Sequence, residues 1–486
     1  MAFSSSRTEP NRELLIGAPP PGQTASLQKT IGAAQFAVFG FGSIVGSAWV
    51  ILLGIWLLHA GPGGAAVGIA LGGAGMALIA AMYAELASRF PQTGGEVTYI
   101  NAVFGKAAGF VVGWLLTLAY LSGLALEGVA LTWLLEVLWP PIAGRTLYVI
   151  FGQPVGSGGL LVSLGCWATI AWLNYRGARS FVRFQNTLTA LFLLVVFVAI
   201  GFELYFGSNH NLRPVWRSGD GESWLIGAAW VFGSAPIMFN SFQAVLQAIE
   251  ERSHTTSKEV VVRLAIVAVG CAALFYLLVV FAAARATPWR ALATSDLPAI
   301  HALASLPWSG ALKTALLLAL IASLLKTWSA VFMTAVRLLF AQAREGMIPG
   351  FFGSVNPRTG SPDKAVIVVA AINFAGLFLG KGMLMPIINI VSLAIALIFA
   401  LICAAALVMR KRDPEHVGFR TPGGYPVGTL AVLAALAMAV FALLQPTPKS
   451  PAADALKWTL LASWTLLGLA LFVSRNRTLL SARRVS

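Results

Sequence analysis

Two hydrophobic stretches of this chain are interrupted by residues that could expose backbone hydrogen-bonding groups. The first interruption is Gly40-Phe41-Gly42-Ser43-Ile44-Val45-Gly46-Ser47, and the second is Gly233-Ser234-Ala235-Pro236, followed by Asn240-Ser241. Hydrocarbon cannot satisfy free N–H and C=O groups, so a helix unwinds inside a bilayer only where these groups face protein, water or a ligand. The two interruptions therefore predict a polar binding site at mid-membrane, and paired breaks favour a carrier built from an inverted repeat.

Two ionisable residues lie inside other apolar stretches. Lys326 is near the middle of the eighth stretch, where a lysine costs about 2.5–3.5 kcal/mol to insert, so a functional role is expected. Glu127 lies in the third stretch, and at 1.5 Å per residue the depths of the two side chains agree within roughly 5 Å. The pair could form a fixed ion bridge or a proton relay. Glu203, closer to the end of its stretch, is expected to reach solvent.

The composition determines the class of protein in which these residues are held. With 58% hydrophobic residues, 10% charged residues and a mean hydropathy of +0.80 over 486 residues, a soluble protein is excluded. The apolar runs long enough to cross about 30 Å of hydrocarbon fall at 31–58, 63–88, 105–139, 156–174, 182–206, 224–249, 260–284, 311–342, 364–380, 383–409, 427–444 and 456–474. We therefore predict an all-α integral membrane protein with about twelve transmembrane helices.

The distribution of basic residues predicts the orientation. Most of the 33 Lys and Arg residues fall in alternate connections, which places both termini in the cytoplasm. Residues 1–30 and 475–486 are accordingly expected to be cytoplasmic tails. The net charge of +15 is explained by this asymmetry and by contact with anionic membrane lipids, so no nucleic acid partner is expected. We expect a bacterial inner membrane.

No residues are spaced for a metal, a cofactor or an enzymatic reaction. The three cysteines, Cys166, Cys271 and Cys403, each lie in an apolar run, and the five histidines are scattered. Neither a zinc-binding helix motif nor a nucleophile elbow is present. The sequence predicts a protein that is not an enzyme.

Four motifs follow one another along the chain. They are Gly40–Ser47; Phe90-Pro91-Gln92-Thr93-Gly94-Gly95-Glu96-Val97-Thr98-Tyr99; Phe239-Asn240-Ser241-Phe242-Gln243 running to Glu250-Glu251; and Arg337-Leu338-Leu339-Phe340-Ala341-Gln342-Ala343-Arg344-Glu345-Gly346-Met347-Ile348-Pro349. In this order they resemble the amino acid–polyamine–organocation carriers with the leucine-transporter type of inverted repeat. The likeness covers nearly the whole chain. Val97 departs from it, because the family commonly has tyrosine there.

The resemblance implies five spans within 31–206, an inverted copy within 224–409 and two peripheral spans within 427–474, with discontinuous first and sixth spans crossing at the substrate. N–H groups around Ser43 to Gly46 would then bind a carboxylate at the positive end of a half-helix. Carbonyls near Phe232 to Ala235 would bind an ammonium group. The alternative is that the glycines only permit close helix packing. The expected substrate-binding residues are Gly40, Gly42, Ser43, Ile44, Val45, Gly46, Phe232, Ser234, Ala235, Asn240, Ser241 and Phe242.

Two of these positions, Phe242 and Ser241, and their neighbour Gln243 bear on specificity. Phe242 lies where the resembled family has an aromatic gate that excludes water from the occluded substrate. Ser241 stands where glycine is common, and Gln243 stands where a carboxylate is common, which removes a negative charge. We therefore expect a neutral or zwitterionic amino acid. A polyamine or other organic amine is the alternative substrate.

The resemblance also raises the question of the coupling ion. Several relatives bind sodium between span one and hydroxyls near Lys326-Thr327, and others have a lysine in span five at the position of Phe192. We expect Lys326 to replace the cation by bonding carbonyls near Val38 to Gly40, or to be tied to Glu127. Proton symport, exchange and facilitated diffusion all stay open. A channel or a non-transporting sensor fits the hydropathy as well, although neither a filter-like repeat nor a signalling domain is visible.

Overall fold

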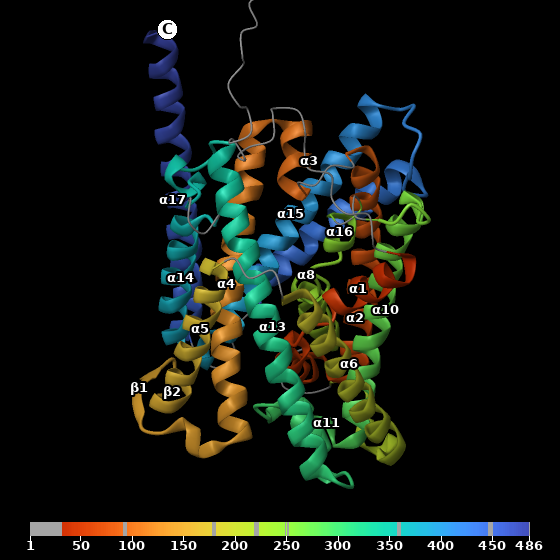
Figure 1. The fold of residues 1–486 in the computed structure, drawn as a ribbon. Coiled ribbons are helices and arrows are strands. Elements are labelled where there is room, and N and C mark those ends of the chain that lie inside the picture. The colour runs from red at the N-terminus through yellow and green to blue at the C-terminus, as the bar shows by residue number, and fades with distance from the viewer. Residues whose placement is uncertain are drawn as a thin grey trace, which may run out of the picture.

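The computed structural model describes residues 32–90, 95–176, 181–217, 223–247, 249, 252–356, 361–445 and 451–485, and these are mostly helical (Figure 1). The four residues 91–94, Glu250, Glu251 and the predicted N-terminal tail lie outside the described residues. The principal helices are α1 (Ala33–Ile44), α2 (Ala48–Arg89), α3 (Gly95–Phe104), α4 (Lys106–Leu138), α5 (Ser157–Arg176), α6 (Phe181–Phe206), α7 (Trp224–Gly233), α10 (Lys258–Ala286), α13 (Ser309–Arg344), α14 (Asp363–Gly376), α15 (Leu384–Arg412), α16 (Gly424–Leu444) and α17 (Pro451–Val485).

Within the described ranges, eight helices are long and apolar enough to cross a bilayer, and α1 and α7 are shorter apolar helices. The chain is therefore a multi-pass membrane protein. α2 has 42 residues, but Gly61 inside it has φ 65° and ψ 174°, which no helix contains, and Pro62 follows. This corner lies between the runs 31–58 and 63–88 that the sequence predicted as separate spans. The count of twelve spans stays a prediction.

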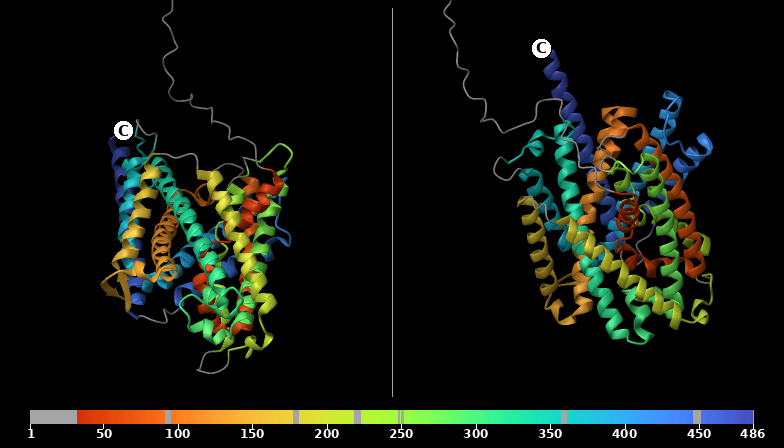
Figure 2. Two further views of the ribbon diagram at one scale, coloured as in Figure 1. Left: turned by 60° about the horizontal axis from the view of Figure 1, so that its bottom comes forward. Right: turned by 45° about the vertical axis from the view of Figure 1, so that its right-hand side comes forward.

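The helices form two groups with α13 between them (Figures 1 and 2). α2 packs against α7 and α10, and α1 packs against α10, on one side. α4 packs against α15, α14 and α5 on the other, and α13 contacts both α4 and α6. α17 runs along the edge of the second group and continues as a helix through residues 475–485, where the sequence predicted a tail.

A short β-hairpin departs from the all-α prediction. Strands β1 (Thr146–Ile150) and β2 (Gln153–Gly156) pair antiparallel, with Phe151 and Gly152 as the turn. Both turn residues have positive φ, 52° and 73°, which is the backbone geometry that closes a two-residue hairpin. The Tyr148 hydroxyl donates to the Phe378 carbonyl at 2.8 Å, which ties the hairpin to the end of α14. The sequence did not predict these strands, because such short strands cannot be distinguished in a chain that is apolar throughout.

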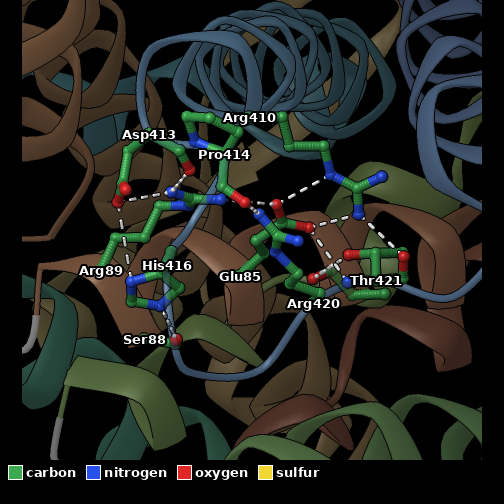
Figure 3. A network of polar contacts seen from close by, with 10 residues as sticks. Glu85, Ser88, Arg89, Arg410, Asp413, Pro414, His416, Arg420 and Thr421 are labelled. Atoms are coloured by element: carbon green, nitrogen blue, oxygen red, sulfur yellow. Dashed lines mark hydrogen bonds and ion pairs between the residues drawn. The ribbon is translucent and has the colours of Figure 1, made fainter.

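At one end of the molecule, the carboxylate of Glu85 is the centre of a buried polar network (Figure 3). It accepts hydrogen bonds from Arg410 Nε at 2.8 Å and Nη2 at 2.5 Å, and from the Thr421 N–H at 3.0 Å. Arg89, one turn further along α2, lies 3.4 Å away. Since the Glu85 side chain is fully buried, these contacts supply the charge compensation that water cannot.

The network continues from Arg89 into the connection between α15 and α16 (Figure 3). Arg89 Nη1 donates to the Asp413 carboxylate at 2.9 Å, and His416 Nε2 lies 2.7 Å from the Ser88 hydroxyl. Burial, reinforced by the nearby Arg89, lowers the pKa of His416 and so favours its neutral ring. The end of α2 is thus fastened to the end of α15 and to the loop that follows it.

We expect Glu85→Ala to destabilise the folded protein by about 3–5 kcal/mol, because it leaves the largely buried Arg410 without its carboxylate and removes one of the two carboxylates beside Arg89. Thermal unfolding of the purified protein in detergent measures this as a lower Tm. Glu415→Ala is the matched control, since Glu415 is an exposed carboxylate in the same connection, and it should leave the Tm unchanged. Equal Tm values for Glu85→Ala and wild type would contradict the structural role of the network.

Candidate functional site

The two predicted interruptions lie against each other. Ser43, near the end of α1, has its hydroxyl 3.0 Å from the Gly40 carbonyl and 3.3 Å from the Ser241 carbonyl. Gly40 and Ser241 belong to different interruptions, so one side chain joins segments that are 198 residues apart in the chain. The juxtaposition expected from the sequence is therefore present.

Tyr276 on α10 also contacts both segments, and the sequence motifs did not indicate it. Its hydroxyl lies 2.9 Å from the Met238 carbonyl and 3.3 Å from the Ile44 carbonyl, and its side chain is buried. A buried Tyr hydroxyl needs a polar partner; here its single proton is donated to the Met238 carbonyl, and the Ile44 carbonyl is a longer, alternative acceptor. A lone tyrosine within the apolar run 260–284 was the signal that could have found it.

The first interruption is unwound where the sequence predicted, but the free donors lie further along. α1 ends at Ile44, and α2 begins at Ala48. The N–H groups of Val45 and Gly46 donate to the carbonyls of Phe41 and Ile44 at 3.0 and 2.9 Å. Among the described residues, the N–H groups of Ser47, Ala48 and Trp49 have no backbone acceptor. They form the positive end of α2.

The second interruption is unwound at its later part, Asn240-Ser241, and is almost fully helical at Gly233–Pro236. Between α7 and the short helix α8 (Ala235–Met238), only Ser234 intervenes, and its carbonyl accepts from the Met238 N–H at 3.2 Å. Pro236 lies in the first turn of α8, where a missing N–H costs nothing, so it does not break the helix. The non-helical residues are 239–242, before α9 (Gln243–Gln247).

Most carbonyls expected to be free are therefore occupied. The carbonyls of Phe232 and Ala235 accept from the N–H groups of Ser234 and Phe239. In the described part of the chain, no backbone N–H donates to the carbonyl of Asn240. Ser241 has φ 80°, a conformation that glycine adopts at no cost and serine adopts under strain. The glycine common in the resembled family would fit this backbone.

The glycines of the first interruption have different surroundings. A Cβ on Gly40 would lie 3.0 Å from Val245 Cγ2, and one on Gly42 would lie 3.0 Å from Thr189 Cγ2, so both positions are small because helices pack there. A Cβ on Gly46 would meet nothing within 4 Å. The packing interpretation thus accounts for Gly40 and Gly42, and Gly46 is the glycine that faces open space.

The two aromatic residues predicted at the site, Phe242 and Phe232, also have different surroundings. Phe242 is fully buried, with its ring 5.1 Å from that of Tyr83 and 5.7 Å from that of Phe399. Phe232 instead packs on Phe441 of α16, with ring centroids 6.4 Å apart, so its side chain points away from the interruptions.

The remaining predicted residues of the second interruption are held by local contacts. Ser234 accepts from Trp56 Nε1 at 3.2 Å and donates to the Val231 carbonyl at 2.6 Å. Asn240 accepts from Gln243 Nε2 at 2.9 Å. Ile44, Val45 and Ala235 are buried apolar residues and offer only their backbone to a ligand.

Lys326 has a different partner from the one expected. Its ammonium donates to the Thr189 hydroxyl of α6 at 2.8 Å, and no hydrogen bond in the described residues joins it to Val38–Gly40. Its side chain is 5% exposed. Thr189 is also the residue that packs on Gly42, so the lysine reaches the first interruption through this threonine.

Glu127 on α4 lies near Thr327 and Lys326. Its Oε2 is buried without a hydrogen-bond partner, and Thr327 donates to the Ser323 and Leu324 carbonyls. No ion pair between Glu127 and Lys326 occurs in the described part of the chain. Lys326, Thr327 and Glu127, the residues predicted to act on the coupling ion, thus lie close together. The fixed ion bridge between Lys326 and Glu127 is not formed.

The chain is similar to several known transporters. The Methylthioribose transporter of Bacillus subtilis (strain 168) is 28% identical over 414 residues, which cover 82% of this chain and 85% of that protein. The Branched-chain amino acid permease BcaP of the same organism is 26% identical over 482 residues, or 93% and 94% of the two chains. The Aspartate-proton symporter of the same organism is 26% identical over 413 residues, which cover 80% of this chain and 74% of that protein.

The sequence profile of one family, Amino acid permease, matches residues 27–470. This range includes both interruptions, Lys326 and Glu127. The resemblance to amino acid–polyamine–organocation carriers is confirmed by this match and by the transporters to which the chain is similar. The chain belongs to the amino acid permease family.

Proposed function

We propose that this protein is a secondary transporter that moves a neutral, zwitterionic amino acid across the membrane by alternating access. The observation that carries the proposal is the contact between the two interruptions through Ser43 and Tyr276. The substrate carboxylate binds the N–H groups of Ser47 to Trp49, and its ammonium binds the carbonyl of Asn240. No residue of 40–49 or 234–247 carries a charge, which suits a substrate whose own charges cancel.

The proposal includes the architecture that the sequence predicts. Twelve spans, two inverted repeats within 31–206 and 224–409 and a peripheral pair would place spans one and six at the substrate. Both termini lie in the cytoplasm of a bacterium, because the basic connections alternate. The corner at Gly61 and the unwound segments 45–47 and 239–242 support this arrangement.

The relatives favour two classes of substrate. The name of the branched-chain amino acid permease supports an apolar amino acid, and that similarity spans 93% of this chain. The name of the methylthioribose transporter supports a neutral sugar thioether instead. Such a sugar has neither a carboxylate nor an ammonium group, so the free N–H and C=O groups at the interruptions favour the amino acid.

Thermal stabilisation of the purified protein tests the substrate class. A ligand that binds only the folded state stabilises it by about 2.7 kcal/mol at a concentration of 100 times Kd. We expect leucine, isoleucine or valine to raise the Tm, and putrescine and methylthioribose to leave it unchanged. A response to methylthioribose alone would replace the amino acid by a sugar thioether, and a response to putrescine alone would make the protein an amine permease.

The bridging hydroxyl of Tyr276 has its own test. We expect Tyr276→Phe to lower the apparent affinity for the substrate about 2- to 10-fold, because one hydrogen bond contributes about 0.5–1.5 kcal/mol. Uptake into proteoliposomes at varied substrate concentration measures it. Tyr148→Phe is the matched control, since it removes a comparable hydrogen bond at the hairpin. Equal losses in both variants would show that Tyr276 acts on the fold alone.

We also propose that Lys326 supplies the positive charge that sodium provides in some relatives. Uptake by the wild type should then be equal in sodium and choline buffers. Lys326→Ala should lose most uptake because the hydrogen bond to Thr189 beside Gly42 disappears, whereas Lys313→Ala, a half-buried lysine nearer the start of α13, should keep it. Sodium-dependent uptake by the wild type would overturn this role.

A further inference from the structure

Glu203 lies near the end of α6 and is only 5% exposed, although its position predicted contact with solvent. It lines a cavity between α6, α2, α10, α13 and the short helix α12 (Pro298–Ala302), together with Trp49, Leu53, Val279, Ala299 and Leu316. The chain between α10 and α13 folds back over this end of the bundle, where α11 (Trp289–Thr294) and α12 both pack on α2. The hydropathy of α6 alone does not predict that the connection between α10 and α13 covers Glu203.

Among the described residues that line this cavity, two carry polar side-chain groups. One is the Glu203 carboxyl, for which no hydrogen bond or ion pair occurs in the described residues. The other is the indole N–H of Trp49, which is buried without a hydrogen-bond acceptor. The other lining residues are apolar, so nothing else is available to compensate a charge on the carboxyl.

The charged and titratable residues on the surrounding elements point elsewhere. Arg285 of α10 donates to the Gly207 carbonyl at 3.0 Å, with its guanidinium 5.6 Å from the centre of the Phe281 ring. His59 of α2, Asp296 and His301 around α12, and Lys313 of α13 form no ion pair with Glu203 within the described ranges. An unpaired carboxylate in such surroundings is unfavourable relative to the neutral acid.

The size and composition of the cavity decide what it binds. It has room for about one water molecule, which excludes an amino acid or an organic ammonium ion. A metal cation takes several oxygen ligands, whereas one carboxyl group is present. A proton needs only that group, and the Trp49 N–H can donate to the carbonyl oxygen of the resulting acid, directly or through a water molecule.

We propose that Glu203 is a proton-binding site that loads when this side of the transporter is open and is enclosed when it closes. The inference rests on the proposed function and adds its coupling ion. In the open state the carboxylate takes a proton from water, and in the closed state the neutral acid is buried against Trp49. Trp49 is two residues from Ser47, so the lining of this cavity continues into the end of α2 that the proposed substrate carboxylate binds.

Infrared difference spectroscopy of the purified protein tests the site without transport. We expect a carbonyl stretch from a buried protonated carboxylic acid at pH 7.5, which shifts in D₂O and disappears in Glu203→Gln. Glu136→Gln, a half-buried glutamate at the same end, is the matched control and keeps the band. Trp49→Phe, which removes the N–H, shifts the band without removing it. A wild-type spectrum that Glu203→Gln leaves unchanged overturns the proposal.

Leucine uptake into proteoliposomes separates this proposal from the proposed function. In the wild type, an inward proton gradient should accelerate uptake, and in Glu203→Gln the acceleration should be lost while leucine exchange persists. Leucine transport with unchanged acceleration in Glu203→Gln overturns the proton site and leaves the transporter standing. The glutamate band without any leucine transport supports the proton site and contradicts the proposed substrate.

Discussion

The whole arrangement depends on keeping backbone polar groups partnered in a medium that offers no water. Continuous helices satisfy this requirement by themselves, but the segments 45–47 and 239–242 do not. Here Ser43 and Tyr276 bind carbonyls on both sides of the contact. In the described part of the chain, the N–H groups before and within the first turn of α2 and the carbonyl of Asn240 have no backbone partner. A binding site arises where the fold stops supplying its own partners.

The other buried polar groups follow the same rule in different ways. Glu85 is surrounded by donors from three segments and serves the fold. Lys326 has one donor contact to Thr189, beside a glycine on which α6 packs. Glu127 and Glu203 are buried with unused hydrogen-bonding capacity. The Glu85 carboxylate thus has donors on both oxygens, whereas Glu127 keeps an oxygen without a hydrogen-bond partner.

The sequence predicted the membrane class, the first unwound segment and the pairing of the two interruptions, because hydropathy and glycine content act locally. It included Gly233–Pro236 in the second interruption as well as Asn240-Ser241, although a proline in the first turn of a helix is tolerated, and the strained backbone lies at Ser241. It could not reveal Tyr276, the cover over Glu203 or the contact of Arg410 with Glu85. Each of these depends on a partner more than thirty residues away in the chain, or on a connection packed against another helix.

The corner at Gly61 has a mechanical consequence. The N–H of Gly63 donates to the Val215 carbonyl at 2.8 Å, Arg217 donates to the Leu58 carbonyl at 2.5 Å, and a side chain at Gly61 would collide with the backbone of Arg217. These contacts hold the two arms of α2, which lie before and after Gly61, rigidly relative to each other. The first arm begins at the free N–H groups near Ser47. The second arm, beyond the corner, ends at the buried polar network around Glu85. The contacts at Gly61 therefore fix the angle between the two arms of α2, so the position of the free N–H groups near Ser47 depends on the connection that contains Val215 and Arg217.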